Sequence, residues 1–411
     1  MKQYSSYRDS GIQWLNEIPA HWKILPGRAL FTENKEKNDG GEHQVLSLSY
    51  GSIIIKKNVN EGLIPENYST YQYIRPGYII IRCTDLQNDK VSLRTSISEY
   101  EGIITGAYLG LIPKPICRSK FIHYLLRAWD CSKELYRYGS GLRQSLSWND
   151  FKYLLLPIPS PEEQEAIVAY LDAATAKIDE AIAQQQRMID LLNERKKIVI
   201  NHAVTKGFNP NVKYKETGIA WIGVIPEHWQ LMQLRYTVSN HDNLRQPITA
   251  DQRERNNPQY YYYGASGVID KIDHYNVDDK VLLIGEDGAN LVLRNLPLVY
   301  KAEGKFWVNN HAHILKPKGN DYDFMALVLE AADYTLFITG SAQPKLSQAN
   351  MNAVKLPIPP IEEQREIVAG IKPKLEKIDS FIEQHSSMVA FLEERKQIII
   401  NDVVTGKVKV V

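Results

Sequence analysis

A stretch near residue 140 combines a flexible backbone with side chains that donate several hydrogen bonds. Gly139-Ser-Gly-Leu is followed by Arg143, Gln144 and Ser145. Arginine can form a bidentate pair with guanine and glutamine with adenine, and each such pair contributes about 1–3 kcal/mol of discrimination between bases. Serine suits phosphate oxygens. The composition favours a loop that contacts DNA, and a solvated surface loop is the alternative.

A second stretch of similar composition follows about 200 residues later. Gly340-Ser-Ala precedes Gln343, which suits a base edge, and Lys345, which suits a phosphate. Weaker DNA-binding candidates follow or lie within predicted strands; they are Arg82, Thr84, Tyr262 and Ser266, and weaker still are Asn309 and Asn310. For the run Tyr260–Tyr263, a place in the core is at least as consistent with the sequence as stacking on DNA.

The sequence contains neither the motifs of an adenine methyltransferase nor a phosphate-binding loop. An adenine methyltransferase needs a glycine-rich cofactor loop and an Asn/Asp-Pro-Pro-aromatic motif. The nearest approach is Asn257-Pro-Gln-Tyr260, in which glutamine takes the place of the second proline. No phosphate-binding loop is present, because Gly406-Lys407 is followed by valine. We therefore predict a binding protein with no catalytic residues of its own.

No metal site is predicted either. Cys83, Cys117 and Cys131 lack the spacing of a zinc site or of a disulfide framework. His311 and His313 alternate as neighbours on a strand do, which places one of them in the core rather than on a metal. The run Asp278-Asp-Lys280 resembles a fragment of a nuclease motif, but a boundary between loop and strand explains it as well.

Composition sets the broad class. The chain has 411 residues, of which 44% are hydrophobic and 24% charged, so two or three folded domains are expected. The net charge of +1 does not by itself indicate nucleic acid, although a basic face can be balanced by acidic residues elsewhere. No apolar run is long enough to span a membrane, and the polar first residues do not form a signal peptide, so a cytoplasmic protein without membrane partners is expected.

The chain is a tandem duplication. Residues 7–22 return at 214–229 with an offset of 207, and both copies end in Ile-Pro-x-His-Trp. Residues 156–164 return at 356–364 with an offset of 200, and both copies run from Leu-Pro-Ile-Pro to Glu-Glu-Gln. The intervals between these blocks, 23–155 and 230–355, share little beyond the glycine-serine stretches and a Leu-Ser pair at 146 and 346. A repeated frame around two different inserts suggests one task performed on two targets, with drift of surface domains as the alternative.

Two long helices are predicted after the second block of each copy. Apolar residues recur at steps of three and four from Glu162 to Val204, and the second copy repeats the stripe up to Ile399. Because Pro373 replaces Ala173, we expect a short helix, a break and then the long helix. Each apolar stripe needs a partner, and the only equivalent stripe is the other helix. The helices should therefore pair antiparallel as a coiled-coil spacer.

The divergent intervals read as mixed α/β globules. Val45–Ser49, Tyr78–Arg82 and Lys280–Ile284 are typical of strands, and helical patches occur at about 119–135 and 321–334. The expected fold is α+β, with two globules joined by the helix pair in a pseudo-two-fold, almost circular arrangement. The predicted domains are 1–160 and 207–360 for the globules, with 161–206 and 361–411 for the spacer regions and the tail.

The ordered blocks resemble the specificity subunits of type I restriction-modification systems over almost the whole chain. The resemblance rests on both Ile-Pro-x-His-Trp blocks, both Leu-Pro-Ile-Pro…Glu-Glu-Gln blocks, Leu192–Thr205 with the following Lys206-Gly-Phe-Asn-Pro-Asn211, and the ending Val404-Thr-Gly-Lys407. In the second insert, three segments are similar to one common class of target recognition domain; they are Tyr262–Val268, Gly285–Asn290 and Lys305–His313.

The resemblance implies a role and a set of partners. Each globule would read one half of a bipartite double-stranded DNA target, with unread base pairs between the halves. Two modification subunits would carry S-adenosylmethionine and methylate adenine, and restriction subunits that use ATP and Mg²⁺ would cut and translocate DNA. The chain itself would hold no cofactor. The alternative from another class is a helical scaffold whose globules bind protein, which predicts no salt-dependent affinity for DNA.

Overall fold

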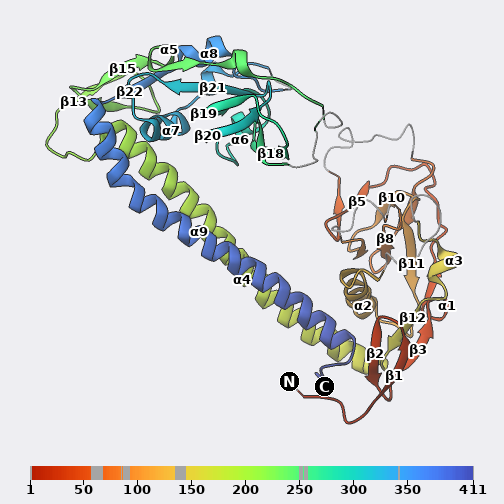
Figure 1. Cartoon of the computed structure of the whole chain (residues 1–411). Helices are drawn as coiled ribbons and strands as arrows, with labels where there is room; N and C mark the ends of the chain where they lie inside the picture. The colour runs from red at the N-terminus through yellow and green to blue at the C-terminus, as the bar shows by residue number, and fades with distance from the viewer. Residues whose placement is uncertain are drawn as a thin grey trace. The chain divides into compact units, whose positions relative to one another are not determined.

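The chain folds into two compact units that share both long helices. The computed structural model describes residues 2–56, 68–84, 86, 93–134, 145–249, 253, 258–340 and 343–410. One unit comprises residues 1–186 with 387–411, and the other comprises residues 187–386 (Figure 1). Each unit holds one globule and parts of the two long helices. The predicted α+β architecture is confirmed.

The first unit begins with a hairpin formed by residues 7–22, which we call the first His-Trp block. Its strands β1 (Tyr7–Ile12) and β2 (Leu15–Pro19) are antiparallel. The chain then enters the globule through β3 (Lys23–Pro26) and leaves it through β12 (Leu155–Ile158), and these two strands pair. Between them lie α1 (Gly27–Leu30), β4 (Phe31–Glu33), β5 (Leu46–Ser49), β6 (Ser52–Ile55), β7 (Gln72–Ile74), β8 (Ile79–Ile81), β9 (Thr95–Ile97), β10 (Gly102–Ile104), β11 (Leu109–Pro113), α2 (Ser119–Cys131) and α3 (Trp148–Phe151).

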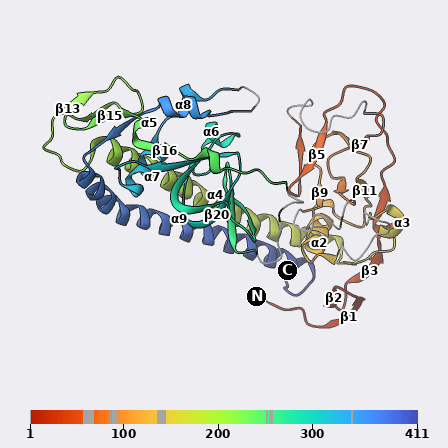
Figure 2. The ribbon, with the colours of Figure 1, turned by 45° about the horizontal axis from the view of Figure 1, so that its top comes forward.

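The second unit repeats this plan. The second His-Trp block, residues 214–229, contains the paired strands β13 (Tyr214–Glu216) and β14 (Val224–Pro226). Strands β15 (Gln230–Gln233) and β22 (Lys355–Ile358) pair where the chain enters and leaves the globule (Figure 1). Strand β15 leads on to α5 (Figure 2). Between them lie α5 (Leu234–Thr237), β16 (Val238–Asn240), η2 (Asp242–Leu244), β17 (Tyr260–Gly264), β18 (Gly267–Ile272), β19 (Val277–Gly285), α6 (Asn290–Leu293), β20 (Val299–Val308), β21 (Ala312–Pro317), α7 (Tyr322–Ala331), η3 (Thr335–Phe337) and α8 (Gln348–Ala353).

The two globules contain the same central sheet, although their sequences differ. In the first globule four strands are ordered β4-β11-β8-β9, and in the second the order β16-β21-β19-β20 continues into β17-β18. The registers match, because Pro113 faces Phe31 in one sheet and Pro317 faces Val238 in the other. The two intervals therefore share few residues, but they share the fold of the central sheet. A buried strand requires apolar side chains but seldom a specific one. Two equivalent strands can therefore have different sequences.

One helix packs against the central sheet of each globule. The apolar face of α2 is buried through Phe121, Ile122 and Leu125, and that of α7 through Phe324 and Met325. A carboxylate near the end of each helix accepts hydrogen bonds from two successive backbone N–H groups where a strand of the sheet begins. Asp130 accepts from Arg94 and Thr95 at 2.5 and 3.1 Å. Glu330 accepts from Leu298 and Val299, both at 2.8 Å.

Both long helices are continuous. Helix α4 spans Pro161–Lys206 and α9 spans Ile361–Val404 with Pro373 in its interior. The predicted break is therefore wrong. Proline removes one backbone hydrogen bond, but Ile367, Ile371 and Ile378 on both sides of it are buried, and this packing holds the helix together.

Within each unit the two helices run in opposite directions. In the first unit, Lys396 of α9 contacts Asp179 of α4 at 2.6 Å. In the second, Lys196 of α4 contacts Asp379 of α9 at 2.5 Å. The two ion pairs use the same repeat positions with the two helices exchanged, since Asp379 repeats Asp179 and Lys396 repeats Lys196. The N- and C-terminal segments also meet in the first unit, where Lys2 and Lys409 form a β-bridge.

The repeated blocks form the joints between globule and helix. Glu163 accepts hydrogen bonds from Tyr4 and Trp22 at 2.7 and 3.1 Å and contacts His21 at 2.9 Å. Glu363 contacts His228 in the second copy at 2.8 Å. Gly207 follows α4 directly and Gly406 lies two residues after the end of α9, and their positive φ angles of +65° and +78° are typical of helix C-termini. A Cβ on Gly207 would approach the ring of Trp229 to 3.2 Å, and one on Gly406 would approach Pro19 to 2.3 Å.

A buried glutamine fixes each joint from inside. Gln164 accepts from the backbone N–H of Arg118 at 2.8 Å, and Gln364 accepts from that of Asp321 at 2.8 Å. Their amide groups donate to the carbonyls of Pro159 and Pro359 at 3.0 and 2.9 Å. The repeated Glu-Glu-Gln sequence is thus explained by one joint made twice. Among the described residues, no helix is long and apolar enough to cross a membrane.

Candidate nucleic-acid interface

Apart from Tyr262, the predicted contact residues that the structure describes lie at the same end of the central sheet in both globules. In the first globule, Arg82 and Thr84 follow β8, and the N–H of Leu146 donates to the carbonyl of Cys83 at 3.0 Å. In the second globule, Glu286 follows β19, and the N–H of Leu346 donates to its carbonyl at 2.7 Å. The same backbone bond therefore ties the loop before α3 or α8 to the end of the matching strand. We call this region the reading edge of each globule.

The reading edge of the first globule is supported by a buried arginine. Arg94 has no exposed surface, and its Nη1 donates to the carbonyls of Arg82 and Thr84 at 3.3 and 2.8 Å. Arg82 and Thr84 are half-buried, and Ser145 is exposed. Burial raises the pKa of the Cys83 thiol to about 12, so it stays neutral within this support. Arg143 and Gln144 lie outside the described residues.

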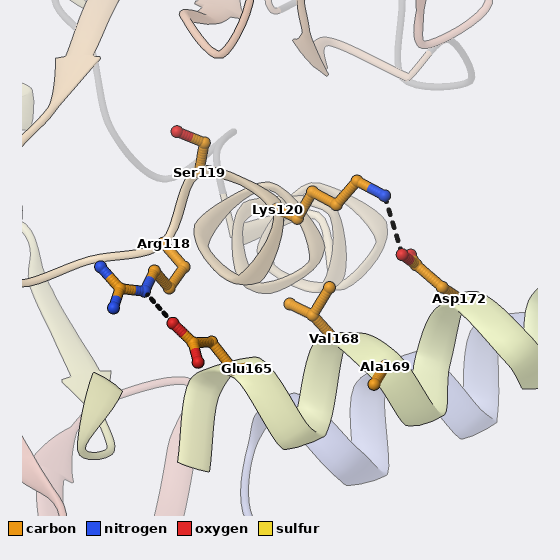
Figure 3. Close-up of a pocket in the computed structure, with 7 residues that line it drawn as sticks. All are labelled: Arg118, Ser119, Lys120, Glu165, Val168, Ala169 and Asp172. Carbon is orange, nitrogen blue, oxygen red and sulfur yellow. Dashed lines mark hydrogen bonds and ion pairs between the residues drawn. The ribbon is translucent and has the colours of Figure 1, made fainter. Parts of the chain in front are cut away.

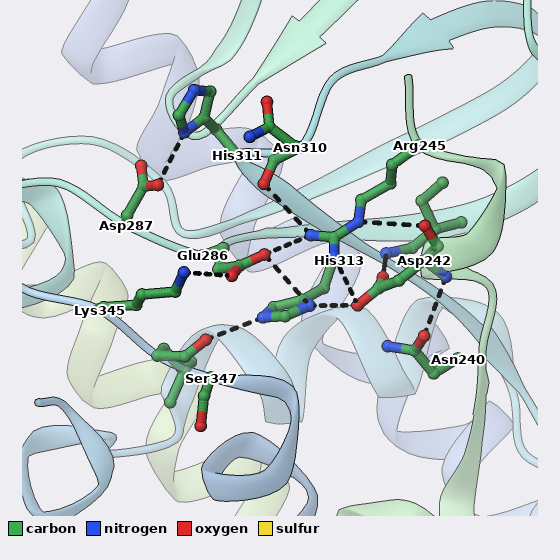
Figure 4. Close-up of polar contacts among 12 residues, drawn as sticks. Asn240, Asp242, Arg245, Glu286, Asp287, Asn310, His311, His313, Lys345 and Ser347 are labelled. Atoms are coloured by element: carbon green, nitrogen blue, oxygen red, sulfur yellow. Dashed lines mark hydrogen bonds and ion pairs between the residues drawn. The ribbon is translucent and has the colours of Figure 1, made fainter. Parts of the chain in front are cut away.

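The reading edge of the second globule is a network of charged side chains (Figure 4). Glu286 accepts from Nη1 of Arg245 and contacts Nζ of Lys345 at 3.1 Å. Nδ1 of His313 lies 2.6 Å from Asp242, and its Nε2 lies 2.9 Å from the carbonyl oxygen of Leu346. The network joins the segment after β16, the end of β19, β21 and the loop before α8. It holds Lys345, a predicted contact, at the surface.

Both carboxylates of this network are stabilised as anions. Burial alone would raise the pKa of Asp242, but the hydrogen bond from His313 and the N–H of Ile314 outweigh it and lower that pKa. Burial also opposes ionisation of Glu286, but Arg245 and Lys345 lower its pKa below the ordinary value. Glu286 and Asp242 are therefore charged near neutral pH. The two carboxylates hold the cationic side chains of Arg245 and Lys345 in position.

Two exposed loops flank the network. His311 contacts Asp287 at 2.7 Å, and its backbone N–H donates to the side chain of Asn309 at 2.8 Å. Asn309 is buried and shapes this turn, while Asn310 is exposed. Gln343 is exposed as well, in the loop whose Pro344 carbonyl accepts from the N–H of Gly288 at 3.0 Å. Donors of different kinds thus converge on one edge.

Of the two candidates on the β17–β18 hairpin, Ser266 is exposed and Tyr262 is buried. Ser266 is exposed in the hairpin turn, which lies against the end of β19, since a Cβ on Gly285 would approach the carbonyl oxygen of Ala265 to 2.6 Å. Tyr262 is wrong as a DNA contact. It is 1% exposed and packs beside Trp307, with Arg253 over its ring at 4.5 Å.

Sequence reasoning missed the residues that support these edges. Arg94, Arg245 and Asp242 lie in segments without a motif, and each acts on a partner at least ten residues away. Glu286 carried a local signal, because a glycine and then a carboxylate after the apolar run Val281–Ile284 mark the end of a strand. No cluster of histidine, cysteine and carboxylates suited to a metal occurs within the part of the chain that the structure describes. The edges offer hydrogen-bond donors and acceptors on rigid supports, as readout of base edges requires.

Comparison with known proteins shows which proteins the chain resembles. The profile of the type I restriction modification DNA specificity domain matches residues 226–386, which include the whole sheet and the reading edge of the second globule. Over 75% of both chains, the sequence is 23% identical to the type I restriction enzyme MjaVIII specificity subunit of Methanocaldococcus jannaschii. The chain is therefore similar to type I restriction enzyme specificity subunits, and the family profile matches its second globule.

Further matches show the same similarity. A Haemophilus influenzae protein named as a type I restriction enzyme specificity subunit is 34% identical over 128 residues, which are 31% of this chain and 32% of that protein. A chain of a solved type I R-M system, described for complex assembly and conformational transition, superposes with a TM-score of 0.63 at 15% identity. That superposition covers 94% of this chain and 98% of the other chain, so the fold is shared over almost the whole length.

Proposed function

We propose that this chain is the DNA-specificity subunit of a type I restriction-modification complex. Each globule reads one half of a bipartite target through its reading edge, and the paired helices set the number of unread base pairs between the halves. Methylation of adenine and restriction of unmodified DNA belong to partner subunits. The chain itself transfers no group and cuts no bond.

The observation that carries this proposal is the equivalence of the two reading edges. The same strand end and the same backbone bond recur in both globules. The side chains differ, since Arg82, Thr84 and Ser145 stand in the first globule where Gly285, Asp287 and Lys345 stand in the second. One scaffold with two sets of donors is what a protein needs to read two different half-sites.

The repeat also supports the proposed assembly. The joints built from Trp22 and Glu163, and from His228 and Glu363, are two copies of one surface. Two modification subunits, each carrying S-adenosylmethionine, would therefore find equivalent docking surfaces. Restriction subunits that use ATP and Mg²⁺ would join this core. These partners and cofactors come from the family's role.

Methylome sequencing tests the function directly. A host that lacks other modification systems would express this chain with its modification partner. We expect one bipartite motif, methylated at adenine in both halves, that disappears when this chain is omitted. Methylation that persists without the chain, or that follows no motif, would refute the proposal.

Binding experiments with single variants test the reading edges. Arg82→Ala should impair recognition of one half-site and Lys345→Ala the other. A base contact carries about 1–3 kcal/mol of discrimination, or roughly 5- to 150-fold in affinity. Lys177→Ala is the charge-matched control, because Lys177 lies exposed on α4 outside both edges. Binding that is independent of salt, or equal loss for all three variants on every sequence, would favour a protein-binding scaffold or nonspecific contacts instead.

A further inference from the structure

A groove in the first unit separates the start of α2 from α4 (Figure 3). Val168 and Ala169 form its apolar floor on α4. Two ion pairs cross it. Nε of Arg118 contacts Glu165 at 2.7 Å, and Nζ of Lys120 contacts Asp172 at 2.8 Å. The globule contributes both positive charges and the helix both negative charges.

The same joint exists in the second unit, and its buried glutamine aligns the two. Gln164 accepts from the N–H of residue 118 and Gln364 from that of residue 321, so α7 matches α2 with an offset of 203. This register places Phe324 on Phe121 and Leu329 on Leu126, all fully buried. On the long helices, Val368 and Ala369 repeat the apolar floor. The apolar parts of the joint are therefore alike.

The charges of the second joint are reversed on both sides. Asp321 and Asp323 stand where the first globule has Arg118 and Lys120. On the second long helix, Arg365 stands where the first has Glu165, and Lys372 stands where the first has Asp172. All four positions change sign, while the buried glutamine between them does not change.

The reversed charges are complementary across the second joint, although they bind nearer neighbours. Arg365 contacts Glu362 at 2.9 Å, and Asp323 contacts Lys301 at 2.5 Å. Asp321 caps α7 by accepting from the N–H groups of Asp323 and Phe324. A globule placed on the other helix would meet like charges at every one of these positions, which is destabilising.

We propose that these charges match each globule to its own helix, so that the first globule fits the start of α4 and the second fits the start of α9. The shared apolar floor and glutamine would accept either globule. The four charges discriminate between them. The inference concerns the assembly of the chain and does not depend on the proposed DNA target.

A charge-reversal cycle at the first joint of the full chain tests this proposal. The helix-side variant is Glu165→Arg with Asp172→Lys, and the globule-side variant is Arg118→Asp with Lys120→Asp. Each should lower the melting temperature by about 2–6 °C, because exposed pairs are individually weak and each variant turns two attractions into repulsions. The variant with all four changes should regain most of that loss. Equal or additive losses without recovery would overturn the proposal.

Two controls separate charge matching from local packing. The neutral variant Glu165→Gln with Asp172→Asn keeps an amide oxygen that can accept from the hydroxyl of Tyr124, which lies 2.8 Å from Asp172, and it introduces no repulsion. It should be less destabilised than the reversed variant. The gap between neutral and reversed variants should shrink in 1 M salt, where the screening length is about 3 Å. A gap that does not change with salt would contradict an electrostatic origin.

Exchange of a whole globule tests the consequence. Residues 230–355 would replace residues 23–155, so that the second globule occupies both positions. With native α4 this chain should melt at lower temperature and be cleaved earlier by protease than the same chain with Glu165→Arg and Asp172→Lys. The same helix changes destabilise the native chain, so rescue in one context and damage in the other is the expected pattern. If the helix changes fail to improve the exchanged chain, the charges do not select the globule.

Discussion

Four residues inserted at the middle of each long helix should widen the gap between the two half-sites of the DNA target. The insertions belong after Gln186 in α4 and after Ser386 in α9, where each helix passes from one unit to the other. Asp179–Lys396 lies wholly on one side of these points and Lys196–Asp379 wholly on the other. Both ion pairs and the packing within each unit can therefore persist.

The size of the effect follows from helix geometry. Helices α4 and α9 contain 46 and 44 residues, or about 69 and 66 Å at ~1.5 Å per residue. Four residues add about 6 Å, which corresponds to roughly two base pairs of DNA at ~3.4 Å each. They also exceed one helical turn by only about 40°, so the apolar stripe nearly keeps its direction. The gap should grow by one or two positions.

Methylome sequencing of a host with the lengthened chain and its modification partner measures this gap. Both half-sites should be unchanged, with only the number of unread positions increased. Insertion in α4 alone is the control. It shifts one helix against the other by about a turn and should lower the melting temperature. If the doubly lengthened complex methylates the original motif with an unchanged gap, the helices act as a clamp for partner subunits and do not set the spacing.

Three further predictions address catalysis, modularity and acid stability. The purified chain alone should transfer no methyl group and cut no DNA, and single-turnover activity that survives repurification would contradict this. Replacing residues 23–155 with the matching interval of a relative should change one half of the methylated motif, whereas a change in both halves would show that the globules do not read independently. Within the interval, Arg143→Ala or Gln144→Ala should impair recognition of one half-site only. A uniform loss of affinity on all DNA sequences would mark these residues as phosphate contacts. Burial, with Arg127 nearby, lowers the pKa of His123 to about 4 from about 6.5, so the stability that neutral His123 gives should be complete above pH 6.5 and be lost as the pH falls toward 4. His123→Ala, which copies the equivalent Ala326, should flatten the fall in the first globule's melting temperature between pH 7 and 5, and an unchanged slope would refute the assignment.

The arrangement of the chain was open to prediction because its signals are local. A repeat is visible by comparing segments, and a helical stripe is visible within two turns, so the duplicated blocks and both long helices followed from residues alone. Strands such as β8 and β19 were visible as short apolar runs between polar residues. The resemblance to the specificity family rested on the order of these same blocks, which no folding is needed to see.

Local signals misled at one place and left the outcome open at another. Pro373 breaks a helix by its own chemistry, yet α9 continues because buried residues on both sides hold it in place. Tyr262 lies in a polar aromatic run, yet its ring is enclosed by Ile272, Trp307 and Arg253. Neither environment is encoded within a few residues of the site. Packing from distant segments therefore decided both outcomes.

Only the tertiary structure showed that the divergent globules are built alike and how their reading edges are supported. The sheet order repeats although the strands share few residues, since buried strands require apolar character rather than identity. Glu286 meets Arg245 and Lys345, and His313 meets Asp242, across 41 to 71 residues of sequence. Such contacts form because burying a charge is unfavourable unless an opposite charge or a hydrogen-bond donor is brought to it. Which distant residue becomes that partner is determined by the fold of the sheet and its loops.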